Sequence, residues 1–165
     1  MGCVSDPIAE AHRQWVAHGW ERAADGMAAV TSVMRAQAIY LARVDAVLKP
    51  FGLTFARYEL LTLLSFTRTG ELPLGKLGSR LQVHPASVTN AVDRLEADGL
   101  VERRTHPTDK RSILAAITPA GRRLAEKATH ALNTDVFEQP GLTRTATRSV
   151  TEVLEDVRRS AGDLT

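Results

Sequence analysis

The amino-acid sequence predicts a mainly α-helical fold that contains a single β-hairpin. Apolar residues recur at spacings of three, four and seven over most of the 165 residues, which is the period of an amphipathic helix. Proline or a hydroxyl residue stands where most of these stretches begin, and only residues 100–117 lose the helical period. The length is sufficient for one domain core with helical extensions.

The composition excludes several classes of protein. The chain carries 21 Lys and Arg against 19 Asp and Glu, so its formal net charge is +2, and 44% of its residues are hydrophobic. This balance argues against a disordered chain and against a histone-like polycation. The longest stretch without a charged residue, 81–92, has 12 residues, whereas a membrane-spanning helix needs about 20. Residues 1–6 lack the basic cluster of a secretory signal, so we expect a soluble cytoplasmic protein.

The first third of the sequence predicts two helices. A short helix begins at Pro7, and its apolar positions follow the helical period. We expect a break near Asp25 or Gly26, because glycine weakens a helix. The period resumes over residues 28–48 and ends at residues 49–52, where a proline and a glycine lie close together.

The middle of the sequence has the outline of a helix-turn-helix. Thr54 is the expected cap of a helix over residues 55–66. A shorter helix is expected over residues 73–81, and a further helix runs from Pro85 to about Asp98. Two helices of this size, joined by a turn of three or four residues, form a helix-turn-helix motif.

Two strands are expected directly after this motif. Residues 100–105 and 111–117 are strand candidates, and the residues between them are rich in turn formers. The hairpin would form a wing beside the helix-turn-helix. Thr118 followed by proline begins another helix, and residues 143–164 predict a last helix whose apolar stripe is long for the end of a monomer.

The helix predicted to start at Pro85 has two contrasting faces. Its compact apolar face consists of Val88, Ala91, Val92 and Leu95. Its opposite face and flanks consist of Ala86, Ser87, Thr89, Asn90, Asp93, Arg94 and Ala97. Small residues let a helix approach the floor of the DNA major groove, where Asn and Arg donate to base edges and hydroxyls contact phosphates. An ordinary solvated face is the alternative, but the neighbouring hairpin favours DNA binding.

The hairpin adds a cluster of basic side chains. Its members are Arg103, Arg104, His106, Lys110 and Arg111. These cations would contact the DNA backbone or place one arginine in the minor groove, whereas simple solvation is the alternative. Asp109 lies two residues before Arg111 and is expected to hold it through a charge-assisted bond. Residues 73–123 hold nine Lys and Arg and five Asp and Glu, a net charge of +4, so the positive charge is concentrated here.

These segments resemble the MarR family of bacterial transcriptional regulators. The resemblance rests on residues 81–83, 87–96, 98–103 and 109–112, with Leu114 and residues 117–122 continuing it. It implies a homodimer whose winged helix-turn-helix lobes bind double-stranded DNA at a palindromic operator. It places Ser87, Thr89, Asn90 and Arg94 in the groove and Lys110 and Arg111 on the wing, with Asp109 orienting Arg111. The corresponding divisions are dimerisation helices over 1–52, the DNA-binding lobe over 53–123, and dimerisation helices over 124–165.

The resemblance also implies a repressor that releases DNA when a small anionic or aromatic effector binds. An additional N-terminal helix resembles the subgroup that responds to urate, but Ala91 stands where that subgroup has an arginine, and Glu59 replaces an aspartate. Urate itself is therefore not expected. The candidate pocket residues are Trp15, Trp20, Arg35, Tyr40, Tyr58, Glu59 and Arg103. The alternative is that the aromatic residues simply pack in the core.

Other functions are less favoured by the sequence. A winged-helix protein-interaction module keeps the fold but does not need Asn90, Arg94 and Arg111 on exposed faces. A redox-sensing regulator would use Cys3, although no second cysteine is present to resolve an oxidised thiol. The scattered histidines predict no metal site, and no catalytic or phosphate-binding motif predicts an enzyme or a cofactor.

Overall fold

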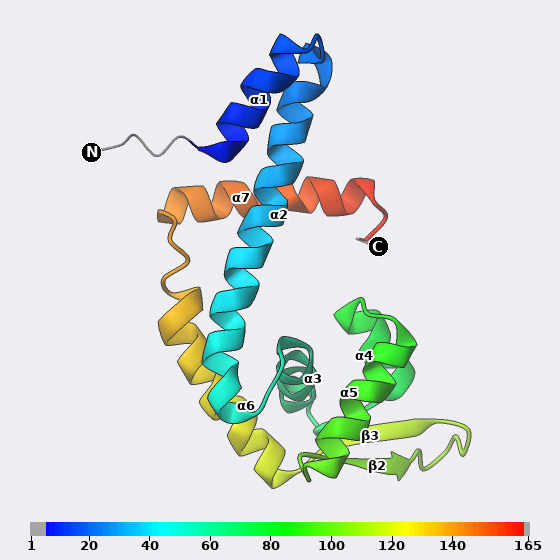
Figure 1. The fold of residues 1–165 in the computed structure, drawn as a ribbon. Coiled ribbons are helices and arrows are strands. Elements are labelled where there is room, and N and C mark those ends of the chain that lie inside the picture. Colours follow the sequence, from blue (N-terminus) through cyan, green and yellow to red (C-terminus); the bar gives the residue numbers. More distant parts are fainter. Residues whose placement is uncertain (1–5, 164–165) are drawn as a thin grey trace. The chain divides into compact units, whose positions relative to one another are not determined.

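The computed structural model describes residues 6–163 and has the mainly α-helical fold that the sequence predicts (Figure 1). The chain forms two compact units, which divide after Arg43, within helix α2. Cys3, and with it the redox prediction, lies outside the described residues. Within residues 6–163, no helix is long and apolar enough to cross a membrane.

The first unit consists of α1 (Pro7–Ala17) and most of α2 (Glu21–Leu48). The chain turns between these helices at Gly19, whose φ of +80° is readily adopted only by glycine. The break predicted near Asp25 or Gly26 is therefore wrong. Gly26 lies inside α2, because a single glycine in a helix of this length costs only about 1 kcal/mol relative to alanine.

The second unit holds the remaining elements and confirms the predicted order of helices and hairpin. They are η1 (Lys49–Phe51), α3 (Phe55–Phe66), β1 (Glu71–Pro73), α4 (Leu74–Leu81), α5 (Pro85–Ala97), β2 (Val101–Thr105), β3 (Ile113–Ile117), α6 (Pro119–Leu132), the π-helical turn η2 (Asn133–Phe137) and α7 (Arg144–Ser160). The hydroxyl groups of Thr54 and Thr118 cap α3 and α6, as predicted.

The strands form one antiparallel sheet in the order β1-β3-β2. β2 and β3 make the predicted hairpin, in which Val101 lies opposite Ile117. The strand β1 was not predicted, because three residues are too few to show an alternating pattern. Pro73, which we expected to begin a helix, ends β1 and directly precedes α4. It can do so because β1 is an edge strand, where proline is tolerated.

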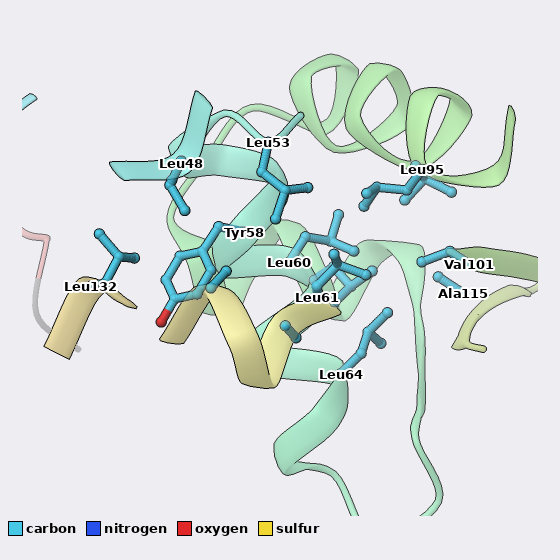
Figure 2. Close-up of a cluster of buried hydrophobic side chains, with 14 of the residues drawn as sticks. Leu48, Leu53, Tyr58, Leu60, Leu61, Leu64, Leu95, Val101, Ala115 and Leu132 are labelled. Carbon is cyan, nitrogen blue, oxygen red and sulfur yellow. The ribbon is translucent and has the colours of Figure 1, made fainter. Parts of the chain in front are cut away.

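The core of the second unit is built around α3 (Figure 2). Its fully buried side chains are Leu60, Leu61 and Leu64. Leu95 of α5 and Val101 of β2 are also fully buried in this cluster, so the second helix of the motif and the wing share one core. On the other side, the Tyr58 hydroxyl forms a 3.0 Å hydrogen bond with the Thr129 hydroxyl, which joins α3 to α6.

Gly121, in the first turn of α6, lies against the backbone of the loop that precedes β2. A Cβ atom at this position would lie 2.1 Å from the carbonyl oxygen of Leu100. The neighbouring Thr118 donates its hydroxyl hydrogen to the carbonyl oxygen of Gly99 at 2.9 Å and its backbone N–H to that of Leu100 at 3.0 Å. Only a residue without a side chain fits this contact.

The last helix, α7, has no buried side chain. Its apolar residues Val150, Val153 and Val157 are 45%, 62% and 57% exposed. Its C-terminal end contacts the turn between α4 and α5, where Arg158 donates to the Gln82 side-chain oxygen at 3.2 Å. The Gln82 amide in turn donates to the carbonyl oxygen of Asp163.

Candidate nucleic-acid interface

The helix α5 is positioned by its first turn and by its apolar face. His84 caps it, since the ring Nδ1 accepts a 3.2 Å hydrogen bond from the backbone N–H of Ala86. This cap was not predicted; the sequence signal was a hydrogen-bonding side chain directly before a proline. Val88, Val92 and Leu95 are buried, as predicted, so the opposite face of the helix points away from the core.

The outward face of α5 carries the polar side chains that we predicted for the groove. Ser87, Thr89, Asn90, Asp93 and Arg94 are all exposed. Asn90, Asp93 and Arg94 line a surface hollow of about 520 Å³. The Thr89 hydroxyl donates to the carbonyl oxygen of Pro85 at 3.2 Å, so it is left only as an acceptor. Within residues 6–163, no hydrogen bond or ion pair engages the side chains of Ser87, Asn90 and Arg94.

The tip of the wing is closed by hydrogen bonds within the turn. The Asp109 carboxylate accepts a 3.1 Å bond from the backbone N–H of Arg111, and the ring Nδ1 of His106 accepts one from the backbone N–H of Asp109 at 3.2 Å. We predicted that Asp109 holds the guanidinium of Arg111, but the carboxylate instead orders its backbone. Lys110 and Arg111 are exposed, so their charges remain available to a ligand.

The other two arginines of the hairpin are already paired. Arg103 forms ion pairs with Asp93 at 2.6 Å and with Glu96 at 2.5 Å, which joins β2 to α5. Partial burial on its own would lower the pKa of Arg103, but the hydrogen bonds and charges of these two carboxylates raise it overall. Arg104 pairs with Glu102 at 2.9 Å and with Glu71 at 3.7 Å.

Comparison with known proteins identifies the family. The MarR family model matches residues 53–113, which run from the start of α3 through the wing tip. Sco5413, a MarR family transcriptional regulator from Streptomyces coelicolor, is 49% identical, with a TM-score of 0.77 over 85% of this chain and 97% of its own. The chain belongs to the MarR family.

Two further relatives show how far the likeness extends. Sco3205 from Streptomyces coelicolor, solved in complex with DNA, is 26% identical, with a TM-score of 0.70 over 80% of this chain and 84% of its own. The HTH-type transcriptional regulator YhbI of Bacillus subtilis is 36% identical over 85 residues, which are 52% of this chain and 54% of that relative. The match to YhbI thus spans about half of each chain.

Two of the candidate effector residues of this MarR protein lie together on α3. Tyr58 and Glu59 line a hollow of about 310 Å³. The other residues that line it are Phe55, Thr62, Leu63, Phe66, Leu81 and Phe137. Burial raises the pKa of Glu59, since its charged form is poorly solvated there.

The remaining candidates for an effector site in this MarR protein lie elsewhere. Trp15, Trp20, Arg35 and Tyr40 belong to the first unit. There Trp20 packs edge-on against Trp15, with ring centroids 5.3 Å apart, and stacks on His18 at 5.6 Å. Arg103 is held by α5 and does not line the hollow beside Tyr58. Within residues 6–163, no group of His, Cys, Asp and Glu is arranged to hold a metal ion.

Proposed function

We propose that this protein is a sequence-specific DNA-binding regulator that inserts α5 into the major groove and lays the β2–β3 wing on the adjacent backbone. The observation that carries the proposal is the exposed outward face of α5. The side chains of Ser87, Asn90 and Arg94 make no hydrogen bond or ion pair within residues 6–163, and the wing tip carries two further exposed cations, Lys110 and Arg111. The match to DNA-bound Sco3205 supports the same mode of binding.

We further propose that two copies bind a palindromic operator, with half-sites about one helical turn apart. Support comes from α7, whose exposed valines need a partner surface. A dimer occupying a promoter would exclude polymerase, so the regulator would act as a repressor.

The hollow beside Tyr58 and Glu59 is lined by aromatic rings and one carboxyl group, which favours an aromatic effector over an anionic one.

The DNA site can be found by selecting bound duplexes from a random-sequence pool. Replacing Asn90 with alanine should then reduce the preference for the selected duplex over an unrelated one by about 5- to 150-fold, because one bidentate base contact contributes about 1–3 kcal/mol of discrimination. Competitive mobility-shift titrations measure this ratio. The matched control is Asn133→Ala, which removes an exposed asparagine from η2 and should leave the ratio unchanged. Equal losses on both duplexes would contradict base recognition by Asn90, and a pool that yields no preferred sequence would favour a protein-interaction module.

Replacing Arg111 with alanine should weaken binding to every duplex. The slope of log affinity against log salt should become shallower by about 0.9 for each phosphate that the variant no longer neutralises. The measurement is the same titration at several salt concentrations, with Lys127→Ala on the exposed face of α6 as the charge-matched control. An unchanged slope for Arg111→Ala would show that Arg111 does not touch the backbone.

A further inference from the structure

The strand β2 is fastened to α5 by one arginine that reaches two carboxylates. The guanidinium of Arg103 lies 2.6 Å from Asp93 Oδ1 and 2.5 Å from Glu96 Oε2. The backbone N–H of Arg103 also donates to Glu96 Oε1 at 3.1 Å. We call these three residues the Arg103 clamp. Because the clamp joins the first strand of the wing to the helix that carries the outward face, it spans the two parts of the DNA-binding surface.

The geometry of the clamp limits how the wing can rotate about α5. Asp93 and Glu96 are one turn apart on the helix, so the two arms of a single planar guanidinium can engage both carboxylates. The side chain of Arg103 is only 27% exposed, whereas those of Lys110 and Arg111 at the wing tip project into solvent. A lysine at position 103 would keep the charge, but its single ammonium group could not engage both carboxylates in the way that the planar guanidinium does.

We propose that Arg103 is a positioning residue, which acts through Asp93 and Glu96 to fix the wing at the angle where Arg111 and α5 engage the same duplex. This inference rests on the proposed DNA-binding function and adds to it a residue that need not touch DNA. Because Asp93 lies on the outward face of α5, the direction of the change in DNA affinity tests the proposal. If only charge mattered, removing two carboxylates beside the groove would strengthen binding to DNA. If the clamp positions the wing, removing them weakens it.

The test uses the full chain and the duplex selected from the random pool. Three variants remove the clamp: Arg103→Ala, Asp93→Asn/Glu96→Gln, and the triple variant that combines them. Each should bind the duplex about tenfold more weakly than the unaltered protein, because the wing is no longer held in place. The three losses should be similar, because residues in one ion-pair network are coupled. The loss in the triple variant should be no larger than that of Arg103→Ala. Glu102→Gln, a carboxylate on the same strand outside the clamp, controls for charge and should bind at least as tightly as the unaltered protein. Thermal melting confirms that each variant folds.

A double-mutant cycle between Arg103 and Arg111 distinguishes positioning of the wing from general loosening of the fold. In an Arg111→Ala background the side chain that the clamp is proposed to aim is absent, so adding Arg103→Ala should change affinity by less than about twofold. The proposal is overturned if Asp93→Asn/Glu96→Gln binds as tightly as the unaltered protein. It is also overturned if Arg103→Ala costs the same with and without Arg111. If the unaltered protein selects no duplex at all, it is the proposed function that fails.

Discussion

Replacing Gly121 with alanine lowers the free energy of unfolding by about 3 kcal/mol, because overpacking against rigid backbone cannot be relieved by a side-chain rotation. The new Cβ atom would lie 2.1 Å from the carbonyl oxygen of Leu100 and 3.0 Å from Ile117 Cγ1. The start of α6 would have to move away from the loop before β2 and break the hydrogen bonds of Thr118 to Gly99 and Leu100. Thermal melting should show a midpoint about 6–12 °C lower.

The matched control for this substitution is Gly75→Ala in α4. A Cβ atom at Gly75 would meet no atom within 4 Å, and its φ is not in the left-handed region. Alanine there should raise stability by up to about 1 kcal/mol, because alanine is the better helix former. A Gly121→Ala protein that melts at the same temperature as the unaltered one would show that α6 is not packed on Leu100.

Replacing Val150, Val153 and Val157 together with serine should convert the proposed dimer to a monomer. Each valine is about half exposed, so burial against a second copy would contribute about 1 kcal/mol per residue. A symmetric dimer holds six of them, and their removal amounts to about 6 kcal/mol, or roughly a 10⁴-fold weaker association. Sedimentation velocity at micromolar concentration measures the change directly.

The control for the α7 variant places serine on the opposite face of the same helix, at Arg148, Glu152 and Glu155. Valine and serine have similar helix propensity, whereas arginine and glutamate are better helix formers than serine. The control therefore weakens the helix more than the valine variant does, while it keeps the apolar stripe. We expect the control protein to remain dimeric. A monomer from both variants would indicate that helix content matters rather than the stripe, and a dimer from both would exclude α7 from the interface.

Local signals predicted most of the DNA-binding lobe. Hydroxyl caps at Thr54 and Thr118 and the proline at position 85 located three helix starts, because these residues satisfy or tolerate the free N–H groups of a first turn. The apolar period of α5 also separated its buried face from its outward face correctly. These features depend on neighbours in the sequence, which is why sequence alone could reveal them.

Features that depend on distant contacts were missed. Arg103 looked like a free cation of the wing, but whether it pairs with Asp93 and Glu96 depends on how β2 folds back onto α5. The strand β1 exists because β3 offers it a partner, and its own three residues carry no pattern. The chain could have turned at either Gly19 or Gly26, and the spacing of apolar residues did not decide between them.

The contact between Gln82 and the end of α7 has a consequence for the order in which the protein matures. Gln82 has a φ of +53°, an uncommon conformation for a residue with a side chain, and its amide is held by Arg158 and Asp163. The partner Asp163 follows 81 residues later in the chain. At about 5–20 residues per second, a ribosome reaches it roughly 4–16 s after Gln82. The turn between α4 and α5 is therefore held by this contact only after the ribosome has added a further 81 residues.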